Sequence, residues 1–131
     1  MKLIKAIFRP EKLRDVKKAL WEEKVRMMTV IDVRGCGQQK GYQSGYRGVI
    51  TEINLQRKVM ILIAVNDSYV DQAVKSIIKG ARTNGGSIGD GKIFILDLID
   101  SIRIRTGERG VAAIGGDSTE LKSLKKMEKV V

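Results

Sequence analysis

The sequence of 131 residues contains no histidine, one cysteine and one proline. The lack of histidine excludes histidine-based catalysis and the usual zinc sites. The single cysteine, Cys36, cannot form an internal disulfide, and we expect a reducing, cytoplasmic location. No run of about 18 apolar residues is present, so we expect no membrane-spanning helix. The charged N-terminal segment does not have the pattern of a secretory signal.

Acidic residues are also too few to balance the basic ones. The chain has 25 lysines and arginines against 15 aspartates and glutamates, a formal net charge of +10. This excess favours anionic partners, namely nucleotides, nucleic acid, anionic metabolites, acidic protein faces or a membrane surface. General solubility explains the charge equally well until the positions of the basic residues are considered.

Hydrophobic periodicity predicts an α+β fold. The order of elements is βαββαβ, which describes a ferredoxin-like, split βαβ domain whose helices cover one face of the sheet. The segment VMILIAV (59–65) is apolar at consecutive positions, so a homo-oligomer that covers the second face would explain it. The predicted strands are 2–8, 28–35, 59–65 and 92–99, and the predicted helices are 11–24 and 70–81, the second after a turn and cap signal at 66–68.

The loop SIGDGK (87–92) is the first candidate binding element. Gly89 and Gly91 permit positive φ, successive amides in such a turn can bind an anion, and Lys92 adds a charge suited to phosphate. Asp90 either shapes the loop, accepts from a ribose or cation, or does neither. The spacing is not that of a Walker A loop, and an ordinary helix-to-strand turn is the alternative.

The segment IRIRTG (102–107) is the second candidate. It is predicted to be extended, which would place Arg103 and Arg105 on one face, where guanidinium groups suit phosphate oxygens. A solvated edge strand is the alternative. The third candidate is the long arm that begins with GCGQQKGYQSGYRG (35–48), because long loops in compact domains are usually functional. In this arm Gln39 offers an oxygen to a cation, while Lys40 and Lys58 offer charges to carboxylates or phosphates.

Several segments together resemble the PII signal-transduction proteins, the trimeric nitrogen regulators of prokaryotes and plastids. The resemblance covers about residues 1–114, a PII-type domain, and leaves 115–131 as a basic tail or short helix. It implies a homotrimer with a T-loop at about 37–57, a B-loop at about 83–92 and a C-loop region at about 103–114. The matching segments are KLIKAIFRPEKLRDVKKAL (2–20), MTVIDVRGCGQQKG (28–41), YRG (46–48), ARTNGGSIGDGKIF (81–94) and IRIRTGERG (102–110).

The resemblance implies ATP or ADP in the clefts between subunits, with 2-oxoglutarate taken up beside Mg-ATP. Arg103 and Arg105 would reach the nucleotide phosphates of the adjacent subunit, and Gln39 would help to hold Mg²⁺. The positions implied for the nucleotide are Thr29, Gly35, Cys36, Gly37, Gln38, Gly89, Asp90, Gly91, Lys92, Arg103 and Arg105. Those implied for 2-oxoglutarate are Arg9, Gln39, Lys40, Gly41 and Lys58.

The sequence departs from the family pattern at several positions. Gln38 stands where many relatives carry a phosphate-directed arginine. Thr51 replaces the tyrosine that is uridylylated or adenylylated, and Val49 replaces a serine phosphorylated in some relatives, so we expect no modification at either position. The B-loop is two residues longer than usual, and residues 115–131 extend beyond the usual end.

The expected function is therefore a non-enzymatic sensor of adenylate nucleotides and 2-oxoglutarate. Through the T-loop it would regulate a target, of which an ammonium transporter at the membrane is the first candidate, and nitrogenase or glutamine synthetase the alternatives. A nucleic-acid-binding ferredoxin-like domain is the alternative of another class. Only Phe8 and Phe94 are aromatic in the predicted strands, whereas RNA-binding sheets carry aromatic clusters, so we expect no nucleic-acid partner. An ATP-hydrolysing enzyme lacks an evident catalytic base.

Overall fold

A four-stranded antiparallel sheet forms one layer of the protein. The computed structural model describes residues 1–37 and 55–114. Within them the spatial order of the strands is β2-β3-β1-β4, and every neighbouring pair is antiparallel. This order and the βαββαβ sequence of elements confirm the predicted α+β, ferredoxin-like fold. The strands are β1 (Lys2–Phe8), β2 (Thr29–Gly35), β3 (Gln56–Val65) and β4 (Gly91–Asp97).

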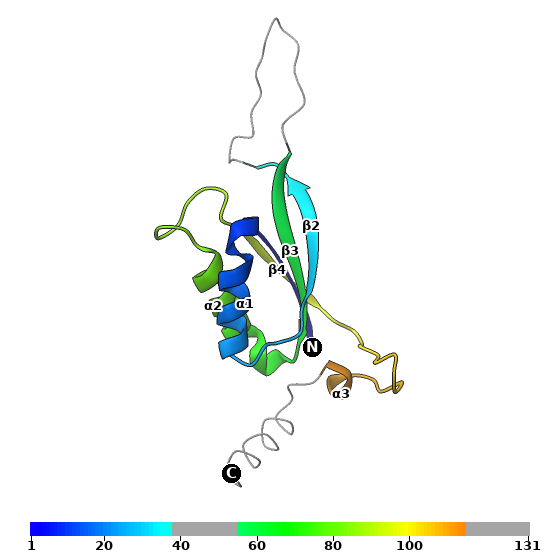
Figure 1. Cartoon of the computed structure of the whole chain (residues 1–131). Helices are drawn as coiled ribbons and strands as arrows, with labels where there is room; N and C mark the ends of the chain where they lie inside the picture. Colours follow the sequence, from blue (N-terminus) through cyan, green and yellow to red (C-terminus); the bar gives the residue numbers. More distant parts are fainter. Residues whose placement is uncertain (38–54, 115–131) are drawn as a thin grey trace, which may run out of the picture.

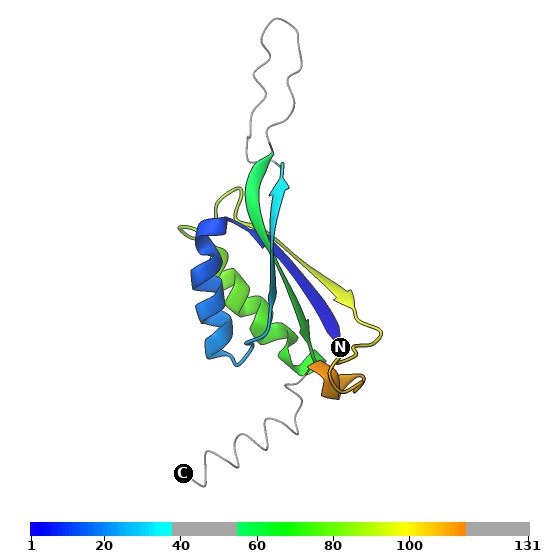
Figure 2. The same cartoon turned by 45° about the vertical axis from the view of Figure 1, so that its right-hand side comes forward.

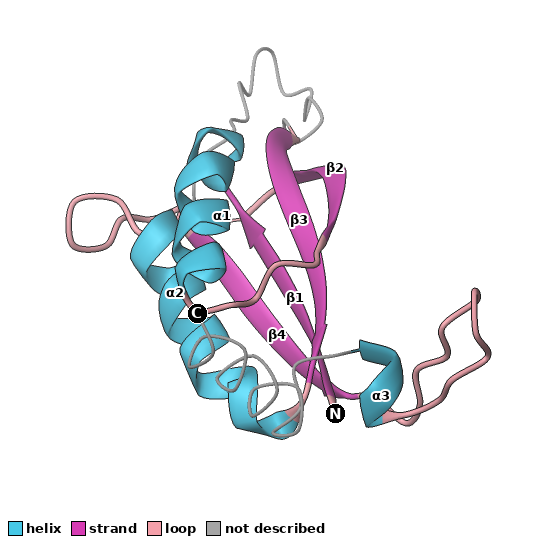
Figure 3. Ribbon diagram, turned by 60° about the horizontal axis from the view of Figure 1, so that its bottom comes forward, coloured by secondary structure: helices cyan, strands magenta, loops and turns pink. Residues whose placement is uncertain are grey.

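Two helices, α1 (Leu13–Glu22) and α2 (Val70–Ala81), form the second layer and cover one face of the sheet (Figures 1 and 3). A short 3-10 turn precedes each of them, η1 (Pro10–Lys12) and η2 (Asp67–Tyr69). Proline suits the first position of such a turn because it has no N–H to leave unpaired. The predicted turn at 66–68 is present, but Asn66 makes no side-chain capping hydrogen bond. No helix in the described ranges is long and apolar enough to cross a bilayer.

The core lies between the helices and the sheet. Side chains alternate along β1 and β3, so every second residue is buried against the helices. The largest fully buried side chains are Ile4, Phe8, Val16, Leu20, Val59, Ile61, Ile63 and Ile77. Gly80 of α2 lies so close to α1 that an added Cβ would stand 2.6 Å from the Cα atom of Val16. The two helices therefore pack with backbone nearly against backbone at this position.

No layer formed by residues 1–37 or 55–114 covers the other face of the sheet, which we call the open face (Figure 3). The register places Leu62 of β3 and Leu3 of β1 on it, together with Phe94 and Leu96 of β4. Phe94 and Leu96 are 47% and 43% exposed. The alternation along β3 therefore leaves a second apolar surface, as its continuous apolar run predicts.

The segment that follows β4 differs from its prediction. Residues 101–110 are not an extended strand: they reverse direction, with an isolated antiparallel bridge between Ile102 and Arg109. The N–H of Gly107 donates to the carbonyl oxygen of Arg103 at 2.7 Å, and Gly107 has a φ of +72°. Glycine adopts this conformation easily, so the Thr106-Gly107 pair permits the turn. The short helix α3 (Val111–Ile114) follows.

Candidate functional site

A groove of about 650 Å³ lies where the end of β2 meets the loop that leads into β4. Its lining combines two of the predicted elements, the glycine pair around Cys36 and the SIGDGK loop, with Lys58 from β3. Ile7 and Phe94 add apolar surface to the same groove. The predicted site residues that line it are Gly35, Cys36, Gly37, Lys58, Gly89, Asp90, Gly91 and Lys92.

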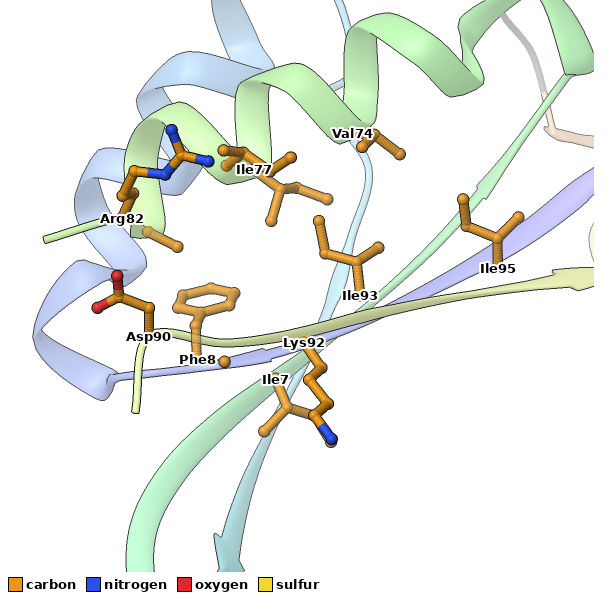
Figure 4. A pocket seen from close by; sticks show the side chains of 12 residues that line it. Ile7, Phe8, Val74, Ile77, Arg82, Asp90, Lys92, Ile93 and Ile95 are labelled. Atoms are coloured by element: carbon orange, nitrogen blue, oxygen red, sulfur yellow. The ribbon is translucent and has the colours of Figure 1, made fainter. Parts of the chain in front are cut away.

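The sheet register explains why these distant segments meet. Gly35 pairs with Gln56 at one end of the sheet, and Gly91 pairs with Phe8 at the same end, because neighbouring strands are antiparallel. Lys92 pairs with Ile7, which places its side chain on the open face. Figure 4 shows Lys92 directed away from α2. The groove therefore has backbone-exposing glycines, apolar side chains and lysines side by side.

The loop between α2 and β4 is shaped by hydrogen bonds of its own. The carboxylate of Asp90 accepts from the Thr83 hydroxyl at 2.6 Å, from the Thr83 N–H at 3.1 Å and from the Ser87 N–H at 2.8 Å. The N–H of Gly86 donates to the Thr83 carbonyl, and that of Asp90 donates to the Ser87 carbonyl. Of the roles considered for Asp90, the structure shows the shaping of the loop. The amides of Gly86, Ser87 and Asp90 are engaged within the loop and are not available to an anion.

Two cations hold the tip of this loop to the sheet. Arg9 donates from a terminal nitrogen to the Ile88 carbonyl at 2.9 Å, and its Nε lies 3.5 Å from Asp90 Oδ1. Lys58 Nζ donates to the Gly89 carbonyl at 2.8 Å. Arg9 follows β1 and Lys58 lies near the start of β3, so both come from the same end of the sheet. The groove thus has a positive margin next to the loop.

The ionisation of the cluster follows from these contacts. The Thr83 hydroxyl, two backbone N–H groups and Arg9 hold the pKa of the Asp90 carboxyl well below its usual range, although partial burial opposes them. Partial burial, and then the nearby Arg9 guanidinium, lowers the pKa of Lys58 from its ordinary value of 10.5. Asp90 is therefore an anion at neutral pH.

Three predicted nucleotide residues lie away from the groove. Thr29 begins β2 and Gly35 ends it, six residues or about 20 Å along the strand. Arg103 and Arg105 belong to the segment at the opposite end of the sheet from the groove (Figures 1 and 2). Arg103 pairs with Glu108 at 3.2 Å and donates to the Ala112 carbonyl. The prediction that Arg103 and Arg105 share one face of a strand is wrong, since a turn spans 104–106.

The remaining predicted site residues, Gln38, Gln39, Lys40 and Gly41, lie outside the described ranges, as do Val49, Thr51 and the tail 115–131. The Mg²⁺ position assigned to Gln39 belongs to this group. Within the described ranges, no cluster of three or more aspartate, glutamate or cysteine side chains could hold a metal ion.

Sequence reasoning missed several residues of the site. Thr83 and Ser87 shape the loop, but their separation of seven and three residues from Asp90 gives no periodic signal. Ile7 lines the groove only because β1 and β4 pair in this register.

A second hollow of about 420 Å³, shown in Figure 4, lies between α2 and β4. Its lining is mainly apolar, with Arg82 and Asp90 at one end.

Comparison with known proteins identifies relatives over most of the chain. Residues 1–108 match the family model described as nitrogen regulatory protein P-II. The chain is 51% identical to nitrogen regulatory protein P-II 2 of Methanothermobacter thermautotrophicus over 114 residues, which cover 87% of this chain and 97% of that protein. It is 50% identical to nitrogen regulatory protein P-II of Klebsiella oxytoca and to P-II 1 of Escherichia coli K12, over 87% of this chain and the whole of each relative.

Proposed function

Because this chain belongs to the nitrogen regulatory protein P-II family, we propose that it senses ATP, ADP and 2-oxoglutarate and passes this information to a target protein. The family is a regulatory one, and we propose that this member too acts by binding and not by catalysis. The observation that carries the proposal is the groove in which Gly35, Gly37, Lys58 and the 87–92 loop meet.

The groove has the chemistry that a nucleotide requires. Ile7 and Phe94 offer apolar surface to a base, and Gly35 and Gly37 allow the backbone to approach the ligand closely. Lys92 offers a point charge to phosphate oxygens. Lys58 and Arg9 would supply the positive charge for a carboxylate next to the phosphates. Mg²⁺, held with the help of Gln39, would offset the repulsion between a triphosphate and a dicarboxylate.

We propose that a second copy of the chain completes the site. Thr29, Arg103 and Arg105 lie at the far end of their own sheet, so in one chain they cannot meet a ligand bound in the groove. A neighbouring copy, packed through the apolar open face, would bring them to it. From the family resemblance we propose that this assembly is a homotrimer, with one nucleotide between each pair of subunits.

The T-loop, about residues 37–57, would be the output of the sensor. ADP and Mg-ATP with 2-oxoglutarate would favour different T-loop states, to the extent that their affinities for those states differ. An ammonium transporter is the proposed target, which would bring a cytoplasmic protein to the membrane, and nitrogenase or glutamine synthetase are the alternatives within the family. Co-purification with each candidate in ADP, and then in Mg-ATP with 2-oxoglutarate, would identify the target as the one whose retention changes.

Calorimetric titration tests the ligand sites. Wild-type protein should bind ATP and ADP, and should release heat with 2-oxoglutarate only when Mg-ATP is present. Lys58→Ala should weaken 2-oxoglutarate about tenfold or more, because a charge-assisted hydrogen bond is lost. ATP affinity should change by no more than about threefold, because Arg9 and Asp90 still anchor the loop.

Lys75→Ala is the matched control, since Lys75 is an exposed lysine on α2 away from the groove. It should leave both affinities unchanged. An equal loss of ATP and 2-oxoglutarate in Lys58→Ala would refute the role given to Lys58. The absence of any 2-oxoglutarate heat in the wild type would refute the sensor mechanism and leave the fold assignment intact.

A further inference from the structure

The Asp90 carboxylate is engaged mainly by donors of the protein itself. A carboxylate offers about four acceptor sites. Oδ1 accepts from the Thr83 hydroxyl at 2.6 Å and faces Arg9 Nε at 3.5 Å. Oδ2 accepts from the N–H groups of Thr83 at 3.1 Å and Ser87 at 2.8 Å. The side chain is only 18% exposed. Three acceptor sites thus take hydrogen bonds from the protein itself, and the Arg9 guanidinium lies beside the carboxylate as an ion pair.

The loop that Asp90 joins together would otherwise be loose. Between Thr83 and Lys92, five residues have positive φ, namely Asn84, Gly85, Gly86, Gly89 and Gly91. Glycine-rich backbone has many accessible conformations, so ordering it costs conformational entropy. Asp90 links the start of the loop at Thr83 and its middle at Ser87 to its end. One side chain therefore fixes the path of all three parts.

The loop in turn holds two cations: Lys58, which lines the groove, and Arg9, which binds the loop beside it. The carbonyl of Ile88 accepts from Arg9, and the carbonyl of Gly89 accepts from Lys58 at 2.8 Å. Lysine and arginine side chains lose considerable rotamer entropy when they are held in place. The carbonyls of a fixed loop therefore place the positive charges before any anion binds.

We propose that Asp90 is a positioning residue whose carboxylate touches neither ligand: it shapes the loop 83–92, and this loop holds Arg9 and Lys58 next to the groove. One carboxylate would then control the phosphate loop and the cation pair together. The inference rests on the proposed function in one respect, that the groove takes a nucleotide and a dicarboxylate. Asp90→Asn should consequently weaken both ligands, although the Asp90 carboxylate contacts neither.

Amide hydrogen exchange in the ligand-free protein tests the shaping of the loop without any assumption about function. The Thr83 and Ser87 amides should exchange about tenfold faster or more in Asp90→Ala, because alanine has no side-chain acceptor for them. Asp97→Ala is the matched control, since Asp97 pairs with Lys2 at the other end of β4 and should leave both amides unchanged. Unchanged exchange in Asp90→Ala would overturn the proposal.

Substitutions of Thr83 test the same contact with less risk of misfolding than substitutions of Asp90. Thr83→Val removes one donor and keeps the shape of the side chain, whereas Thr83→Ser keeps the hydroxyl. We expect ATP affinity to fall about fivefold in Thr83→Val and in Asp90→Asn, and to be nearly normal in Thr83→Ser. The double variant should be less impaired than the two single effects multiplied, because both changes weaken the same Thr83–Asp90 contact.

Ligand titrations separate positioning from direct contact. With Asp90→Asn, ATP without Mg²⁺ should weaken along with Mg-ATP and 2-oxoglutarate. If only the Mg²⁺-dependent part of binding falls, Asp90 is a metal ligand and the proposal is overturned. If the wild type binds no ATP, the proposed function fails, and the exchange of the Thr83 and Ser87 amides still decides whether Asp90 shapes the loop.

Discussion

At the scale of single residues, Gly91 shows how tightly the groove is constrained. Its φ is +116°, and an added Cβ would stand 1.8 Å from the carbonyl oxygen of Ile7. Gly85 in the same loop also has positive φ, +80°, but an added Cβ would meet nothing within 4 Å. A side chain at Gly91 therefore meets both an unfavourable backbone conformation and the backbone of β1, whereas at Gly85 it meets only the first.

We predict different effects of alanine at these two glycines. Gly85→Ala should lower the free energy of unfolding by about 1–2 kcal/mol, the usual cost of a left-handed non-glycine residue. Gly91→Ala should lower it by about 3 kcal/mol or more, because β1 and β4 must also separate locally. Urea unfolding measures both values. Equal losses would show that the close approach of Gly91 to the Ile7 carbonyl adds nothing to the cost of a side chain at this position.

At the scale of elements, the contact between α1 and α2 depends on one glycine. An added Cβ at Gly80 would stand 2.6 Å from the Cα and 2.7 Å from the N atom of Val16. These are backbone atoms, which cannot move aside as the end of a flexible side chain can. In an isolated helix, alanine would be favoured over glycine by about 1 kcal/mol. Helix propensity thus predicts that Gly80→Ala raises the free energy of unfolding, whereas packing against Val16 predicts that it lowers it.

We predict that packing decides the outcome for Gly80→Ala. The free energy of unfolding should fall by about 1–3 kcal/mol, since overcrowding between helices exceeds the gain in propensity. Lys79→Ala is the control in the same helix, at an exposed position, and should change it by less than about 0.5 kcal/mol. Thermal or urea unfolding gives both values. A stabilised Gly80→Ala variant would mean that the helices can separate at little cost.

At the scale of the whole molecule, the proposed site is divided between the two ends of one chain. The groove lies at the end of the sheet where β2 finishes, and the segment between β4 and α3 lies beyond the other end. Arg103 belongs to this segment and pairs with Glu108. The open face carries apolar side chains such as Leu96, which is 43% exposed. In a single chain these side chains would contact water. Assembly of several copies would bring the two parts of the site together and would bury the apolar open face.

We predict that Leu96→Glu converts the assembly to monomers, because it places a charge in an apolar interface. Trp21→Glu is the control, since Trp21 is 58% exposed on α1, on the helix layer, and should leave the assembly intact. Light scattering should give about three times the chain mass for wild type and control. Monomeric Leu96→Glu should also lose nucleotide affinity. A monomeric wild type that binds ATP fully would contradict the shared site.

The sequence determined the elements and most of the chemistry of the groove. Periodicity is a local property, so α2 was predicted at 70–81, where it lies, and the βαββαβ order was sufficient to predict the fold. Glycine and lysine at 87–92 likewise identified the loop, because positive φ and positive charge are properties of the residues themselves.

The tertiary structure decided which of these residues meet. The antiparallel register, and not sequence distance, places Gly35 and Gly91 at one end of the sheet and Thr29 at the other. The Asp90 carboxylate accepts hydrogen bonds from Thr83 and Ser87, and these donors stabilise its negative charge within the loop. Arg103 pairs with Glu108 across a turn, which the alternation of isoleucine and arginine at 102–105 does not predict. Contacts of this kind depend on how backbone segments converge, which no local pattern of residues records.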